Sequence, residues 1–107
     1  MHATKALEGR IAVVTGAARG LGSAYAAALA GAGARVVIAD IDGRQAVATA
    51  AEIRGGIPIT VDVSSEGDVE RLFATVRHEL GRLDILINNA AASPKCTSSP
   101  GCTSARR

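Results

Sequence analysis

The sequence has few aromatic and sulfur-containing residues. Its 107 residues include no tryptophan and one methionine, and Tyr25 and Phe73 are its aromatic side chains. Apolar residues still make up 48% of the chain, which is typical of a globular protein rather than a disordered one. We therefore expect one small domain whose core consists of Val, Ile, Leu and Ala.

Both cysteines, Cys96 and Cys102, lie near the end of the sequence. They have no neighbouring histidine and no short spacing between them, so we predict neither a metal site nor a disulfide. The first ten residues have no apolar signal core, and the uncharged stretch 21–34 is too short and too rich in Gly and Ala to span a bilayer. We expect cytoplasmic residence and no membrane partner.

The net charge of +2 is unevenly distributed. Lys95, Arg106 and Arg107 supply +3, so the first 92 residues carry −1. This distribution argues against a nucleic-acid partner. Residues 93–107 are rich in Ser, Thr and Pro and contain no Val, Ile, Leu or aromatic residue. We predict a disordered tail there, after a nucleotide-binding domain at residues 1–92.

Apolar runs and helical patterns alternate along the first 92 residues. The sequence predicts strands at residues 11–15, 35–40, 57–61 and 85–87. It predicts helices at residues 21–32 and 43–54, and a third that follows a capping-box pattern at Ser65 and ends at Gly81. Helices of at least about eleven residues between buried strands indicate right-handed parallel crossovers. The expected fold is α/β, a Rossmann-like doubly wound parallel sheet truncated after about four strands.

Residues 15–22 read Thr-Gly-Ala-Ala-Arg-Gly-Leu-Gly and lie between the first strand and the first helix. Gly16, Gly20 and Gly22 form a G-x-x-x-G-x-G pattern, which differs from a Walker A loop and from G-x-G-x-x-G spacing. An ordinary glycine-rich turn is the alternative, but the position between strand and helix favours a pyrophosphate site.

Two charged residues bear on the cofactor. Asp40 ends the second strand, 18 residues beyond Gly22, where it can accept hydrogen bonds from an adenosine ribose and repel the 2′-phosphate of NADP. It could instead only start the next turn. Arg19 favours NADP instead, since a cation beside the glycines can bind a 2′-phosphate. Asp40 faces the ribose more directly, so NAD is predicted over NADP.

Polar residues also end the third and fourth strands. Asp62 can accept from the adenine amino group, or it can cap the turn at Ser64 and Ser65. Asn88 and Asn89 can tie neighbouring loops together and line a ribose pocket, and we expect at least one of them to be structural.

Taken together, these elements resemble the short-chain dehydrogenase/reductase family, over residues 7–92. The matching motifs are the glycine turn, Asp40, Asp62-Val63 and Asn88-Asn89-Ala90. The resemblance implies hydride transfer between a nicotinamide cofactor and an alcohol or carbonyl substrate. The cofactor-binding residues it implies are Gly16, Arg19, Gly20, Leu21, Gly22, Asp40, Ile41, Asp62, Val63, Asn88, Asn89 and Ala90.

The sequence departs from the family in two places. Ala91 replaces the glycine of the usual Asn-Asn-Ala-Gly. The catalytic Tyr-x-x-x-Lys pair is absent, since the only tyrosine is Tyr25 and the only lysines are Lys5 and Lys95. We therefore predict no catalytic residue in this chain, a fragment inactive alone, and an oligomer interface that is largely missing.

Two other functions stay open. The chain could be a stand-alone NAD-binding regulatory module, although an uncovered fourth strand would be prone to aggregate. It could also be a different Rossmann protein such as a methyltransferase, against which the Asn-Asn-Ala element and the glycine spacing argue.

Overall fold

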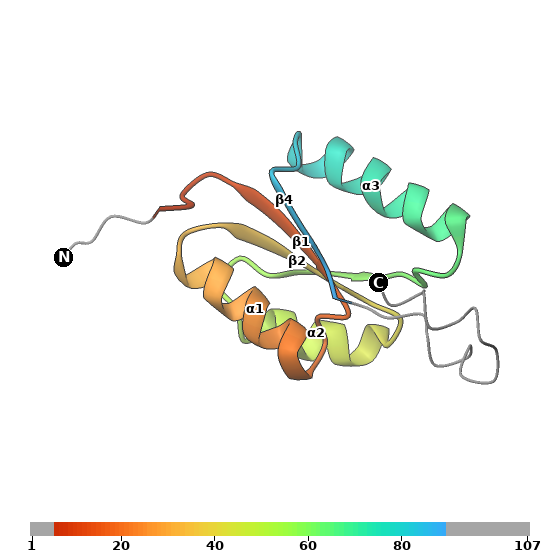
Figure 1. Ribbon diagram of the computed structural model, residues 1–107, viewed down its shortest axis with the longest axis horizontal. Helices are drawn as coiled ribbons and strands as arrows, with labels where there is room; N and C mark the ends of the chain where they lie inside the picture. The colour runs from red at the N-terminus through yellow and green to blue at the C-terminus, as the bar shows by residue number, and fades with distance from the viewer. Residues whose placement is uncertain (1–5, 90–107) are drawn as a thin grey trace, which may run out of the picture.

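The computed structural model describes residues 6–89, in which strands and helices alternate (Figure 1). The elements are β1 (Ile11–Thr15), α1 (Gly20–Gly31), β2 (Arg35–Asp40), α2 (Gly43–Ala51), β3 (Ile57–Thr60), α3 (Glu66–Leu80) and β4 (Ile85–Asn88). Each predicted element is present, with ends that differ from the prediction by at most three residues. The predicted tail at residues 93–107 lies outside the described residues.

The strands form one parallel sheet in the order β3-β2-β1-β4. Val13 of β1 pairs with Val37 on one side and with Leu86 on the other. Strands β2 and β3 thus add in turn to one side of β1, and β4 then adds to the other side. This topology confirms the predicted Rossmann-like doubly wound fold, in which ligands bind at the carboxyl edge where the strand order reverses. Here that point lies between β1 and β4.

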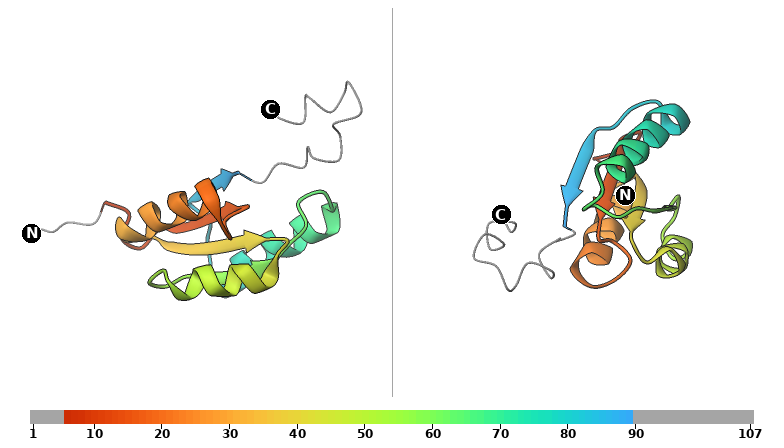
Figure 2. Two further views of the ribbon diagram at one scale, coloured as in Figure 1. Left: turned by 90° about the horizontal axis from the view of Figure 1, so that it is seen from below. Right: turned by 90° about the vertical axis from the view of Figure 1, so that its right-hand side faces the viewer.

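Helices cover both faces of the sheet (Figures 1 and 2). The alternation of side chains along β1 and β2 divides the buried residues into two clusters. On the α1 and α2 face the cluster includes Ala12, Val14, Ala26, Val36, Ile38, Ala46 and Ala50. On the α3 face it includes Ile11, Val13, Val37, Ala39, Val61, Leu72 and Val76. The small alanines on α1 and α2 let these helices lie close to the sheet.

The two edge strands are less buried than the two central ones. Every residue of β1 is buried, whereas β3 and β4 alternate between half-buried and exposed residues. Pro58 lies in β3, where its missing N–H is tolerated because the strand is at an edge. On β4, Leu86 is 47% exposed on the face that α3 only partly covers.

The end of α2 differs most from the prediction. The helix ends at Ala51 and has nine residues, whereas we expected it to reach Arg54. A separate turn follows, in which the N–H of Gly56 donates to the carbonyl oxygen of Ile53 at 2.9 Å. A Cβ on Gly56 would lie 2.6 Å from the Ala50 carbonyl oxygen, so this glycine allows the chain to turn back against the helix end.

Candidate functional site

The glycine turn joins β1 to α1 at the carboxyl edge of the sheet. Gly16 has φ +65° and Gly20 has φ +64°, a backbone conformation that side-chain-bearing residues rarely adopt. A turn of this shape therefore requires glycine at both positions. It brings the chain from the buried end of β1 directly into the first turn of α1.

The N-terminus of α1 has no side-chain cap. Its N-cap residue, Arg19, makes no capping hydrogen bond, and the first turn contains no acidic residue. By contrast, Asp42 caps α2 by accepting from the N–H of Gln45, and Ser65 likewise caps α3. The first N–H groups of a helix need acceptors, and the helix dipole favours an anion there. Among the helices of residues 6–89, α1 is the one whose start lacks a side-chain acceptor.

The glycine turn is packed against the end of β4. The side-chain amide of Asn89 donates to the Gly16 carbonyl oxygen at 3.2 Å. A Cβ on Gly22 would overlap that same oxygen and lie 2.8 Å from Asn89 Nδ2. Gly22 is thus required by close approach of the backbone, whereas Gly16 and Gly20 are required by their φ angles. Asn88, one residue earlier, accepts from the Thr15 hydroxyl at 3.1 Å and joins the ends of β1 and β4.

Asp40 lies at the end of β2, beside the same turn. One carboxylate oxygen accepts from the Ala18 N–H at 3.0 Å, and the other accepts from the Asp42 N–H at 2.9 Å. The carboxylate therefore joins the glycine turn to the loop that enters α2. The predicted strand-end aspartate does start the next turn, and it also contacts the predicted cofactor loop.

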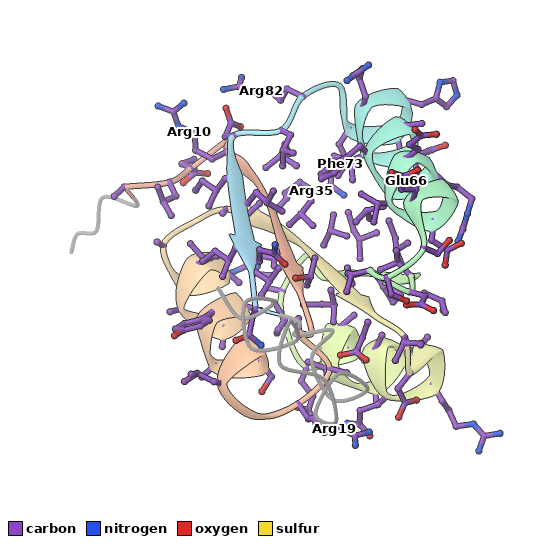
Figure 3. The ribbon with its side chains drawn as sticks, turned by 45° about the vertical axis from the view of Figure 1, so that its right-hand side comes forward. Arg10, Arg19, Arg35, Glu66, Phe73 and Arg82 are labelled. Carbon is purple, nitrogen blue, oxygen red and sulfur yellow. The ribbon has the colours of Figure 1, made fainter. Side chains whose placement is uncertain are left out.

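Arg19 forms an ion pair that the sequence interpretation missed. Its guanidinium donates to Asp42 Oδ2 at 2.6 Å, and the Arg19 side chain is largely exposed. Figure 3 shows Arg19 at the end of the molecule toward which the strands point. The sequence signal for Asp42 was its place immediately before α2, where an aspartate is a favoured N-cap.

A second missed residue, Thr49, supports the turn from α2. Its hydroxyl donates to the Ala18 carbonyl oxygen at 2.5 Å, and the side chain is buried. Because Asp40 binds the N–H of the same residue, both backbone groups of Ala18 are held by neighbouring elements. No sequence pattern pointed to Thr49, since a threonine within a helix usually reads as a surface residue.

Asp62 follows β3 and forms a local turn. One of its carboxylate oxygens accepts from both the N–H and the hydroxyl of Ser64, at 2.9 and 2.6 Å. The capping box at Ser65 is only half formed, because Asp68 turns away from the N-cap and accepts from the Asp62 N–H at 2.9 Å. That backbone hydrogen bond, together with the Arg71 guanidinium, lowers the pKa of Asp68.

The remaining predicted site residues are apolar. Leu21 and Ile41 are 62% and 66% exposed, one after Gly20 and one after Asp40. Val63 lines a cavity of about 270 Å³ between α3 and β4, together with Thr15, Val69, Leu72, Phe73, Leu86 and Asn88. Figure 3 shows Phe73 on the side of α3 that faces the sheet. Ala90 lies outside the described residues.

A second charged cluster lies at the opposite edge of the sheet. Asp84 accepts from the Ile11 N–H at 2.8 Å and forms ion pairs with Arg82 at 2.9 Å and Arg10 at 3.6 Å. Arg10 and Arg82 lie at the far end from Arg19 (Figure 3). Hydrogen bonds from Arg82 and then from Ile11 lower the pKa of Asp84. This cluster ties β4 to β1 and lies away from the glycine turn.

Comparison with known proteins identifies the family. The family model of short chain dehydrogenases matches residues 10–104. The chain belongs to the short chain dehydrogenase family. It is 46% identical over 86 residues to L-fucose dehydrogenase of Oryctolagus cuniculus and 46% identical over 86 residues to sorbitol dehydrogenase of Cereibacter sphaeroides. These matches cover 80% and 79% of this chain but 30% and 34% of the relatives. The chain therefore spans about a third of the length of the curated relatives it matches.

Solved structures agree with this family fold. The NADH complex of 3-ketoacyl-(acyl-carrier-protein) reductase from Brucella melitensis is 36% identical, with a TM-score of 0.72 over 76% of this chain and 34% of that chain. Hydroxysteroid dehydrogenase from Escherichia coli is 35% identical, with a TM-score of 0.78 over 81% of this chain and 39% of that chain. The predicted family membership is confirmed.

Membrane-spanning helices and clusters of metal ligands are both missing from the described part of the chain. None of the helices in residues 6–89 is long and apolar enough to cross a bilayer. The same residues hold no group of three or more His, Cys, Asp or Glu side chains suited to a metal ion.

Proposed function

We propose that this chain binds NAD at the carboxyl edge of its sheet, as the coenzyme-binding part of a short chain dehydrogenase. The observation that carries the proposal is the glycine turn at the uncapped start of α1, located where the strand order reverses. Family membership supplies the ligand class, and one structural relative is a complex with NADH.

The residues around the turn fit a dinucleotide. Within the described part of the chain, no other group lies within 4 Å of the position that a Cβ on Gly20 would occupy, so there is open space beside the uncapped helix start. Asp40 already accepts one N–H at each carboxylate oxygen. A carboxylate oxygen has two lone pairs, so each can still accept a ribose hydroxyl. The site thus offers N–H donors for an anion at the start of α1 and a carboxylate that accepts from hydroxyls at the end of β2.

We assign each part of the cofactor to residues at this edge. Arg19, Gly20 and Leu21 would hold the pyrophosphate through their backbone N–H groups. Asp40 with Ile41 would hold the adenosine ribose, Asp62 with Val63 the adenine, and Asn89 with Ala90 the remainder, while Asn88 would stabilise the sheet through its hydrogen bond to Thr15. In this assignment Gly16 and Gly22 shape the turn rather than contact the ligand. Asp62 would keep its hydrogen bonds to Ser64 and would line the adenine pocket, because it lies directly after β3 at the carboxyl edge of the sheet.

Bound NAD would supply the hydride acceptor, and this chain would supply binding and orientation. Proton transfer to or from an alcohol substrate needs a positioned acid or base. The family's Tyr-x-x-x-Lys pair is not in the sequence, because Leu29 stands four residues after Tyr25. We therefore propose a chain that binds the cofactor and does not turn over substrate by itself.

The test is a titration of the 10.8 kDa chain with NAD, in which amide chemical shifts are monitored by NMR. We expect the amides of residues 16–22 and of Asp40 to shift in a saturable manner. The amides of residues 81–84, at the opposite edge, serve as the internal control and should stay in place. A well-dispersed spectrum in which NAD at millimolar concentration moves no amide of the turn would contradict the proposal.

A further inference from the structure

The Arg19–Asp42 ion pair lies beside the position proposed for the adenosine ribose. Arg19 reaches across from the glycine turn to the loop after β2, where its guanidinium donates to Asp42 Oδ2 at 2.6 Å. Asp42 is in turn connected to Asp40, because its N–H donates to Asp40 Oδ1 at 2.9 Å. The cation that would suit a 2′-phosphate is thus already paired.

The Asp42 carboxylate is held in place independently of Arg19. Its other oxygen, Oδ1, accepts from the N–H of Gln45 at 3.1 Å and caps α2. The side chain is 44% exposed, whereas that of Arg19 is 68% exposed. The fixed carboxylate therefore sets where the flexible arginine rests.

We propose that Asp42 is a specificity-determining residue that disfavours NADP by pairing with Arg19 and adding a second negative charge beside Asp40. This inference rests on the proposed function. A 2′-phosphate carries about −1.5 to −2 charges at neutral pH. Beside the proposed ribose position it would meet the carboxylates of Asp40 and Asp42 against one guanidinium. NAD has hydroxyls there, which a carboxylate accepts.

The decisive variant is Asp42→Asn, because asparagine is also a favoured N-cap and keeps the cap of α2 while removing the charge. Dissociation constants of NADH and NADPH are measured by titration calorimetry at low salt. We expect NADPH to bind about tenfold more tightly than it does to the native chain, since one unit charge roughly 6 Å from a dianion changes affinity by about that factor in water-like surroundings. The affinity for NADH should change by less than about twofold.

Two background variants identify which arginine is released. In an Arg19→Gln background, the gain from Asp42→Asn should be smaller, because the removed charge of Asp42 still contributes but the freed guanidinium is absent. In an Arg44→Gln background the gain should persist, although Arg44 also lies in the first turn of α2. Glu52→Gln, at the far end of α2, makes the same change in net charge and should alter neither affinity.

The outcomes separate the inference from the proposed function. A native chain that binds NADH, with an Asp42→Asn variant that gains nothing for NADPH, overturns the inference alone. A gain that survives Arg19→Gln in full also overturns it, because Arg19 would then not be the released group. A native chain that binds neither nucleotide overturns the proposed function and the inference together. Circular dichroism of each variant checks that the fold is retained.

Discussion

Gly22→Ala should destabilise the glycine turn, because the turn has no room for a side chain at this position. The added Cβ would overlap the Gly16 carbonyl oxygen and lie 2.8 Å from Asn89 Nδ2. Because the Gly16 oxygen belongs to the backbone, it cannot rotate away, and the whole turn must shift. Overpacking of this kind costs about 1–3 kcal/mol. Loss of the Asn89–Gly16 hydrogen bond adds about 0.5–1.5 kcal/mol.

Part of this loss is offset within α1. Alanine is favoured over glycine inside a helix by about 1 kcal/mol at most. The net expectation is that Gly22→Ala lowers the free energy of unfolding by about 0.5–3.5 kcal/mol. Urea unfolding followed by far-ultraviolet circular dichroism measures this value by linear extrapolation. A distorted turn should also weaken NAD binding in the same preparation.

Gly31→Ala is the matched control, at the other end of the same helix. Among the described residues, no other group lies within 4 Å of the position that a Cβ on Gly31 would occupy, and Gly31 does not have a positive φ. This substitution should raise stability by about 0.5 kcal/mol, since alanine restricts the unfolded chain more than glycine does. If Gly22→Ala is as stable as the native chain while Gly31→Ala is stabilised, the packing argument at Gly22 is wrong.

Three further outcomes are expected. Thr49→Val removes the hydroxyl bound to the glycine turn and should lower the unfolding free energy by about 1–2 kcal/mol, with Thr75→Val as the control in urea unfolding. The hydrogen bond from Arg82 lowers the pKa of Asp84 below its ordinary 3.8, so its contribution to stability is present above that value and is lost as the pH falls through the lower folded pKa. Asp84→Asn should therefore flatten the acid end of the stability curve, and an unchanged slope would contradict this. Leu86→Lys on the exposed edge strand β4 should reduce self-association in sedimentation velocity. Equal association of the variant and the native chain would show that the chain does not self-associate through β4.

The strands and helices were predictable because their signals are local. β1 and β2 are short apolar runs bounded by a turn, and they are buried on both faces as such runs predict. α2 was harder to bound, because Gly55 and Gly56 lie beyond an additional turn that has no strong residue preference. The fold class needed only the order of the elements and the rule that parallel crossovers are right-handed.

The side-chain contacts at the site were less predictable, because their partners are far apart in the sequence. Asn89 and Gly16 are separated by 73 positions, and Thr49 and Ala18 by 31. Composition and periodicity say that a polar side chain ends a strand, but not which oxygen or N–H it meets. The sequence allowed two roles for Asp62, a contact to the adenine and a local turn. The structure shows the hydrogen bonds of the turn with Ser64.

The contacts around the turn also say how the site would bind. Ala18 is held through its N–H by Asp40 and through its carbonyl by Thr49, and Gly16 is held by Asn89. The turn is therefore fixed from β2, α2 and the end of β4 before any ligand arrives. A preorganised loop loses little conformational entropy on binding, which leaves more of the contact free energy for affinity. In the proposed site, the first-turn N–H groups of α1 would then already face the pyrophosphate. Removing any one of the three holding side chains should weaken NAD binding, even though none of the three holding contacts is made to the pyrophosphate.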